Sequence, residues 1–202
     1  MKYFFFVTFA ILLFNKSQAQ KQQIQLSIGQ SFNGTGDTRG LNFATEYNKY
    51  FKKKLNWSAA LGGTIHDGFF PIFYEYPSGR QNDGSVRYTI AGFQATSHIS
   101  YNFLNSLQHE FLFRIGTVLR YQSSSYWDVV TVLYTPITGI PYPVVVFENT
   151  TPQKTVAIGG STQISYAYTI QQKISIGFVA GFQFDTQGDN ISQVSLTIGR
   201  RF

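Results

Sequence analysis

The feature that most constrains the fold of this chain is the alternation of side-chain character along its last twelve residues, Ile191–Phe202. Successive side chains of an extended strand point to opposite faces. Val194, Leu196 and Ile198 therefore share one face, whereas the residues between them are small or polar. A strand of this kind separates an apolar environment from a polar one, as in a wall between lipid and a polar lumen.

Seven further segments alternate in the same way, and no window shows the periodicity of a helix. They are Ile24–Phe32, Leu41–Phe51, Leu55–His66, Val86–Phe103, His109–Gln122, Thr155–Ile170 and Ile174–Phe184. Eight strands form the smallest common closed barrel. The sequence therefore predicts an all-β fold, an eight-stranded antiparallel up-and-down transmembrane barrel with extracellular hairpin loops.

The N-terminus has the pattern of an export signal. Lys2 precedes an apolar run, Tyr3–Phe14, and the small residues Ser17 and Ala19 provide a cleavage site. The run is too short to cross a bilayer as a helix, although an uncleaved anchor is the alternative. We expect residues 1–19 to be a cleaved signal peptide and residues 20–202 to form the barrel domain. The absence of cysteine excludes disulfides and a cysteine-linked lipid.

The connections between the predicted strands alternate in length. The short ones are Lys52–Lys54, Leu104–Gln108 and Gln171–Lys173, and the long ones are Asn33–Gly40, Asp67–Ser85, Ser123–Lys154 and Asp185–Asn190. Short turns are periplasmic in outer-membrane barrels. Most acidic residues fall in the long connections, whereas many lysines fall near the other end. Both termini are therefore predicted on the periplasmic side.

Two long connections carry apolar and aromatic residues. The segment Asp128–Asn149 has two β-branched runs around a Pro/Gly turn, which predicts a hairpin beyond the membrane. Exposed apolar surface often marks an interaction site, and the alternative is that the two loops form a lid over the barrel mouth. The candidate interaction residues are Phe69, Phe70, Phe73, Tyr74, Tyr134, Tyr142 and Phe147.

Strand parity also predicts a network of charged side chains in the lumen. Its members are Glu46, Arg87, His98, Glu110, Arg114 and Arg120, together with Tyr88 and Arg201. Opposite charges in a narrow interior should pair, and an eight-stranded barrel is only wide enough for its own side chains. We therefore favour a plug of ion pairs. A narrow pore or a small-ligand cavity is the alternative, because many lumen residues are Gly, Ser or Ala.

The signal peptide, eight alternating strands, short inner turns and terminal Phe202 resemble the small outer-membrane barrels of the OmpA/OmpX type. The resemblance implies location in the outer membrane, contact with its lipids and lipopolysaccharide, and insertion by the barrel-assembly machinery. Arg200 departs from the usual C-terminal signal, which has an aromatic or apolar residue there. The use of Phe, Tyr, Asn and Lys is similar to that of Bacteroidetes barrels.

The sequence gives little support for an enzymatic function. His98, Ser100 and Glu110 superficially resemble the catalytic set of outer-membrane lipid A deacylases, but that family places its motif on the lipid face before the final hairpin, where this chain has no histidine. We expect no catalytic residues, cofactor or metal ligands. Export also disfavours a nucleic-acid partner, despite the net charge of +6.

The sequence thus predicts a non-enzymatic barrel that presents loops for binding or adhesion, or that serves as a subunit of an outer-membrane assembly with a protein partner. A narrow porin-like channel or small-ligand pore is the alternative, and a lipid A-modifying hydrolase is the second alternative.

Overall fold

The computed structural model describes residues 22–34, 38–52, 54–75, 79, 81–104, 106, 108–140 and 143–202. The proposed signal peptide and Tyr142 lie outside these ranges, as does the side chain of Tyr74. Cleavage after Ala19 therefore stays a prediction.

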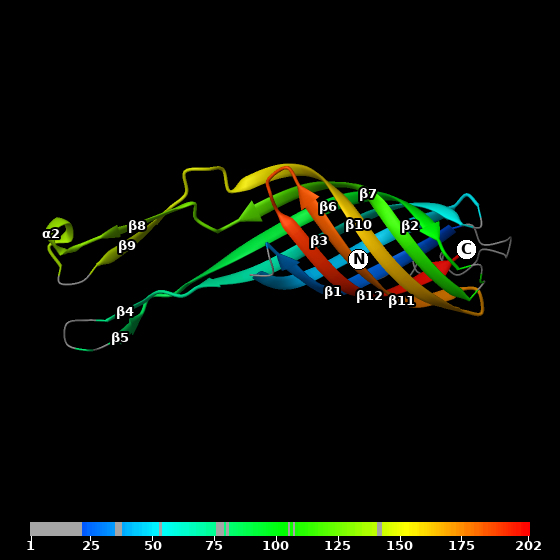
Figure 1. Ribbon diagram of the computed structural model, residues 1–202, viewed down its shortest axis with the longest axis horizontal. Helices are drawn as coiled ribbons and strands as arrows, with labels where there is room; N and C mark the ends of the chain where they lie inside the picture. Colours follow the sequence, from blue (N-terminus) through cyan, green and yellow to red (C-terminus); the bar gives the residue numbers. More distant parts are fainter. Residues whose placement is uncertain are drawn as a thin grey trace, which may run out of the picture.

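Eight antiparallel strands close into a barrel, as the sequence predicts (Figure 1). They are β1 (Gln22–Asn33), β2 (Thr38–Tyr50), β3 (Leu55–Phe70), β6 (Val86–Asn102), β7 (His109–Ser124), β10 (Lys154–Ile170), β11 (Ile174–Asp185) and β12 (Asn190–Arg201). Each strand pairs with the next along the chain, and β12 pairs with β1 to close the wall. Every predicted strand segment overlaps one of these strands.

The barrel is apolar outside and polar inside. On β12, Leu196 is 72% exposed on the outer face, whereas its neighbours Ser195 and Thr197 are 3% and 6% exposed in the lumen. The same inversion occurs on β1, where Leu26 is exposed and Gln25 is buried. Only lipid can cover an outer face of this composition, so the fold is that of a transmembrane barrel. In the described part of the chain, no helix is long and apolar enough to cross a membrane.

One half of the barrel wall is taller than the other. The neighbouring strands β3, β6, β7 and β10 have 16 or 17 residues, whereas β1, β2, β11 and β12 have 12 or 13. A membrane crossing needs about 9–11 residues. The four long strands therefore extend beyond the apolar band at the end of the barrel that carries the long loops, which we call the loop end. The opposite end is the short-turn end.

Two hairpins continue this taller wall. The first contains β4 (Phe73–Glu75) and β5 (Gln81–Asp83), and the second contains β8 (Val129–Leu133), the short helix α2 (Thr135–Thr138) and β9 (Val144–Glu148). The second is the hairpin that the sequence predicts. Both run along the barrel axis away from the mouth, as Figure 1 shows, and do not fold across it as a lid. The prediction ended β3 at His66, but pairing with β6 continues to Phe70. Gly68 permits this pairing, because a Cβ atom there would overlap the ring of its partner Tyr88.

Several glycines of the lumen face allow adjacent strands to coil tightly. A Cβ atom at Gly116 on β7 would overlap the carbonyl oxygen of Ser97 on β6 and would lie 2.7 Å from Cδ2 of His98. Backbone atoms cannot move away without breaking the ladder of hydrogen bonds. Gly116 is therefore required for the curvature of the wall at this position.

We expect the substitution Gly116→Ala to lower the free energy of unfolding by about 1–3 kcal/mol, because the added methyl group meets backbone. Unfolding by urea in lipid vesicles would measure the loss. Gly160→Ala is the matched control, since a Cβ there meets only the ring of Phe184, at 2.9 Å, and this ring can turn away. Equal losses in the two variants would contradict the explanation.

Candidate functional site

An ion pair crosses the middle of the lumen. Arg114 on β7 donates from Nη1 to both carboxylate oxygens of Glu46 on β2, at 2.6 and 2.8 Å. The two strands are not neighbours in the wall. The side chains are 2% and 12% exposed, so the pair connects opposite parts of the wall through the interior.

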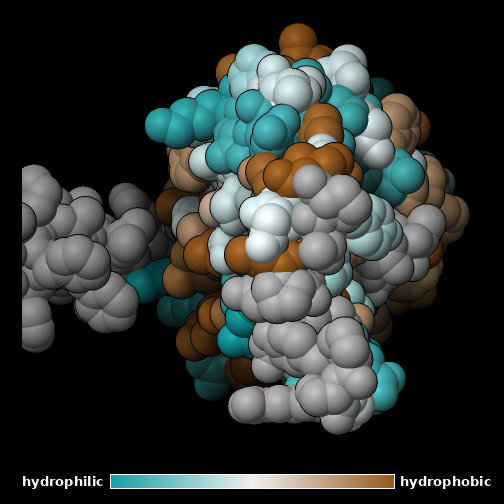
Figure 2. Space-filling model, turned by 90° about the vertical axis from the view of Figure 1, so that its left-hand side faces the viewer, coloured by the Kyte–Doolittle hydropathy of each residue, from teal (hydrophilic) through white to brown (hydrophobic). Residues whose placement is uncertain are grey.

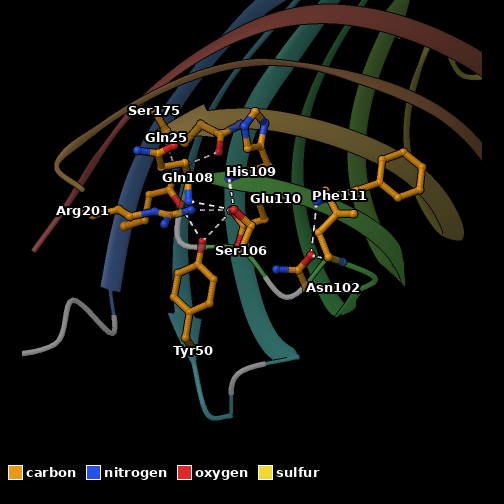
Figure 3. A network of polar contacts seen from close by, with 12 residues as sticks. Gln25, Tyr50, Asn102, Ser106, Gln108, His109, Glu110, Phe111, Ser175 and Arg201 are labelled. Atoms are coloured by element: carbon orange, nitrogen blue, oxygen red, sulfur yellow. Dashed lines mark hydrogen bonds and ion pairs between the residues drawn. The ribbon is translucent and has the colours of Figure 1, made fainter. Parts of the chain in front are cut away.

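A second network fills the short-turn end (Figure 3). Arg201 donates from Nη2 to Oε2 of Glu110 at 2.7 Å. The Tyr50 hydroxyl lies 3.2 Å from the same oxygen and 2.6 Å from Oε1 of Gln23. Gln23 in turn donates to Oγ of Ser175 at 2.6 Å. Residues from β1, β2, β7, β11 and β12 thus meet here and occupy the lumen.

A third group lies toward the loop end. His66 Nε2 is 2.9 Å from Oγ of Ser31, and Arg120 donates from Nη2 to Oγ1 of Thr64 at 3.3 Å. Between this group and the central ion pair lies a polar cavity of about 40 Å³, lined by residues that include Gln25, Asn42, Glu46, Gln163 and Gln193. This volume holds about three water molecules. The lumen thus contains three layers of hydrogen-bonded side chains and a small cavity.

The structure places most of the predicted lumen residues inside the barrel. Glu46, His98, Glu110, Arg114 and Arg120 are in the lumen. The prediction that Arg87 lies in the lumen is wrong, because its side chain is exposed on the outer side of β6.

The lumen row of β6 consists of even-numbered residues, so Arg87 and its neighbour Tyr88 cannot share it. Tyr88 follows this row above the barrel mouth. Sequence reasoning also missed Tyr50, which parity does place on the inward row of β2.

The histidine and serine of the superficial deacylase resemblance are not assembled as a triad. His98 Nε2 lies 2.7 Å from Oγ of Ser161 on β10. Within the described residues, Oγ of Ser100 has no hydrogen-bond partner, and Glu110 is bonded to Arg201. No group of three His, Asp, Glu or Cys side chains suited to a metal ion occurs in the described ranges.

The two projecting hairpins meet in a cluster of five aromatic rings, which we call the aromatic junction. Trp127 is at its centre and is only 5% exposed. Its ring centroid lies 4.3 Å from Phe147, 5.1 Å from Tyr126, 5.6 Å from Phe70 and 5.9 Å from Tyr88. Phe70 and Tyr88 lie at the ends of β3 and β6, which lead into the first hairpin, and Phe147 lies on β9 of the second. The junction therefore fixes the base of one hairpin against the base of the other.

Backbone contacts reinforce the aromatic junction. The Ser125 amide donates to the Thr89 carbonyl at 3.0 Å, and the Thr89 amide donates to Oγ of Ser125 at 2.8 Å. A Cβ at Gly68 would overlap the ring of Tyr88, so glycine allows this ring to lie over the strand. The sequence signal that could have found the junction is Trp127, one of only two tryptophans.

Asp128 fixes the base of the β8–β9 hairpin. Its carboxylate accepts hydrogen bonds from the Thr150 amide at 2.8 Å, the Thr150 hydroxyl at 2.6 Å and the Thr151 amide at 2.9 Å. These donors favour the charged form. The bonds from Thr150, followed by those from Thr151, hold the pKa of Asp128 well below its ordinary value of 3.8.

The predicted interaction residues divide into two groups. Phe69, Phe73 and Tyr134 are 56%, 67% and 64% exposed, whereas Phe70 and Phe147 are half-buried in the aromatic junction. Ile137 at the tip of the second hairpin is 75% exposed. Figure 2 looks onto the loop end and shows apolar side chains exposed among hydrophilic ones. The hairpins therefore have an anchored base and an apolar surface open to solvent.

This combination of a closed antiparallel wall, an apolar outer belt and a polar lumen defines the fold of the small eight-stranded outer-membrane barrels. Two solved structures are similar over 92% of this chain and 100% of their own. Ail, the attachment invasion locus protein of Yersinia pestis, was solved with the heparin analogue sucrose octasulfate and has 10% sequence identity and a TM-score of 0.55. Neisserial surface protein A has 11% identity and a TM-score of 0.53.

These likenesses concern the fold. No family model matches the chain, and no curated protein matches it in sequence. The outer-membrane barrel fold agrees with the outer-membrane location that the sequence predicts. The Bacteroidetes origin stays a prediction from composition.

We expect Arg114→Leu to lower the free energy of unfolding by about 3–5 kcal/mol, because Glu46 would be left charged and unpaired in the lumen. The double variant Arg114→Leu, Glu46→Gln should recover most of that loss. Urea unfolding in lipid vesicles measures both. If the double variant is as unstable as the single one, packing rather than charge explains the effect.

The depressed pKa of Asp128 predicts how the hairpin base responds to acid. The contribution of the carboxylate is fully present above pH 3.8, its ordinary pKa, and is lost as the pH falls further. Hydrogen-exchange protection factors of the Thr150 and Thr151 amides should follow this course. In Asp128→Asn they should be lower at pH 7 and should no longer change in acid. An unaltered acid profile in that variant would contradict this role.

Proposed function

We propose that this protein is a non-enzymatic outer-membrane barrel whose two projecting hairpins bind another protein outside the membrane. The observation that carries the proposal is the aromatic junction, which buries Trp127 and anchors the two hairpins, one of them the apolar β8–β9 hairpin. Anchoring of this kind orders the hairpins before binding, and less ordering entropy is then lost on association.

The β8–β9 hairpin is apolar on both faces. On one face, Val130 is opposite Phe147 and Val132 is opposite Val145. On the other face, Leu133 is opposite Val144 and Thr131 is opposite Val146. The hairpin forms a sheet of two strands only, with no third strand among the described residues. A two-stranded sheet is marginally stable in water, and an added surface or strand would cover it.

Charge indicates the class of partner. The described carboxylates of the loop end are Asp67, Glu75, Asp83, Asp128, Glu148, Asp185 and Asp189. The described cations there are Arg39, Arg87 and Lys154 outside the lumen and Arg120 inside it. An acidic surface repels polyanions such as the heparin analogue bound by the Ail structure. A protein with an apolar contact surface fits the hairpins better. That protein is either an extracellular target or a neighbour in an outer-membrane assembly.

The two alternatives receive less support. The three layers of hydrogen-bonded side chains in the lumen oppose a channel, because each layer occupies part of the cross-section. The separation of His98, Ser100 and Glu110 into different contacts opposes a hydrolase of the deacylase type. The hairpins are therefore the part of the molecule best suited to a specific task.

The proposal predicts a discrete protein contact at the hairpin tip. A photo-reactive amino acid in place of Tyr134 should cross-link one protein species in intact cells, and mass spectrometry would identify it as a surface target or a membrane neighbour. The same group in place of Phe93, which faces lipid and is 56% exposed, should give none.

The exposed valines give a matched test: Val130→Thr with Val132→Thr should reduce the cross-link at least about five-fold, because a partner would cover their methyl groups.

Thr131→Ser, which alters the opposite face of the same strand, is the control and should leave the cross-link in place. Absence of any cross-link from Tyr134, or equal labelling from Phe93, would overturn the proposal. Protection of the Trp127 region from protease verifies that each variant keeps the hairpin.

A further inference from the structure

The outer face of the short-turn end carries cations without carboxylate partners. Five described residues, which we call the basic arc, lie on the outer rows or turns of this end; they are Lys49, Lys52, Lys54, Lys173 and Arg200. The two lumen carboxylates, Glu46 and Glu110, are already paired with Arg114 and Arg201. All other described side-chain carboxylates are at the loop end. No described side-chain carboxylate is therefore available to pair with the basic arc.

The strand register makes the basic arc continuous. The residue after Lys173 pairs with Arg200 on β12, and Arg200 pairs with Ile24 on β1. Ile24 pairs with Tyr47 on β2, and Lys49 follows two residues later on the same outward row. Neighbouring strands are about 4.8 Å apart. The cations thus follow one stretch of rim from the β10–β11 turn, across β12 and β1, to the β2–β3 turn.

The other half of this rim carries aromatic rings and no described lysine or arginine. Lys54 of the basic arc borders it, with Nζ 5.8 Å from the ring centroid of Tyr101. Tyr101 and Phe103 on or next to β6 lie 5.1 Å apart by ring centroids, and Phe103 lies 5.9 Å from Phe111 on β7. His109 on β7 lies 5.1 Å from Tyr168 on β10. Aromatic rings are enriched at the interface between lipid and water. The two halves of the rim therefore differ in charge.

We propose that the basic arc binds the phosphate groups of anionic phospholipids in the membrane leaflet at the short-turn end. Lysine and arginine side chains at this depth bury their apolar stems along the barrel and extend their charges to the headgroups. Each cation near an anionic lipid surface adds favourable energy. Anionic phospholipids thus collect along β11, β12, β1 and β2, and the aromatic half shows no such preference.

Trp57 provides a local reporter for this site, because it lies on β3 directly opposite Lys49. In a Trp127→Phe background, the full barrel is placed in phosphatidylcholine vesicles that contain brominated phosphatidylglycerol or brominated phosphatidylcholine. Quenching of Trp57 fluorescence should be stronger with phosphatidylglycerol. Replacement of all five cations of the basic arc by Gln should lower the binding of phosphatidylglycerol relative to phosphatidylcholine. The expected decrease is at least about five-fold, because the loss of even one cation contact has an effect of that size.

Two controls make the test specific. A reporter on the aromatic half, Phe111→Trp with Trp57→Phe, should show no headgroup preference. Removal of the loop-end cations by Arg39→Gln, Arg87→Gln and Lys154→Gln should leave the quenching of Trp57 unchanged. If the five-residue variant does not fold, the same question can be asked of the barrel that keeps all five cations. About 0.5 M salt should then abolish the preference of Trp57 quenching for phosphatidylglycerol, because salt screens the charges.

Equal quenching of Trp57 by the two lipids would overturn the proposal, as would a preference that survives both salt and the substitutions. Binding of the protein to isolated cell-wall material would be measured as well. If the five-residue variant loses this binding and Trp57 shows no headgroup preference, the lipid proposal is overturned in favour of a cell-wall contact. None of these outcomes depends on the hairpins, so the test is independent of the proposed function.

Discussion

The pairing of β12 with β1 is the interaction on which the rest of the structure depends. In lipid, a backbone N–H or C=O group without a partner costs several kcal/mol, so a sheet can cross a membrane only when it has no edge. Eleven residue pairs between these strands, from Gln23 with Arg201 to Asn33 with Ile191, remove that edge. Closure then forces one row of each strand outward into lipid and the other into a narrow interior.

That interior explains the polar residues that would be out of place in a soluble core. Burial of an unpaired charge is costly, and Glu46 with Arg114 and Glu110 with Arg201 avoid that cost by pairing. Arg120 instead donates to the Thr64 hydroxyl. Glycines of the lumen face, such as Gly116 beside His98, provide space for the larger side chains. The lumen is therefore a stabilising element, and the two proposed binding surfaces lie at the ends of the barrel.

The two ends differ in shape and in charge. At the loop end, four tall strands raise two acid-bearing hairpins, of which β8–β9 is apolar, and Trp127 packs at their base. At the short-turn end, cations occupy one half of the rim and aromatic rings the other. The first arrangement suits a protein partner, and the second suits anionic headgroups.

The sequence by itself determined the barrel, its strand number and the parity of most lumen residues, because a period of two is a local property of the chain. It also indicated the β8–β9 hairpin through the valine runs of Asp128–Asn149. It did not determine the partner of Glu46 or the role of Trp127, and it placed Arg87 on the wrong face. Only the tertiary structure decided these points, since they depend on which distant strands close together and on how far β3 and β6 stay paired beyond the membrane.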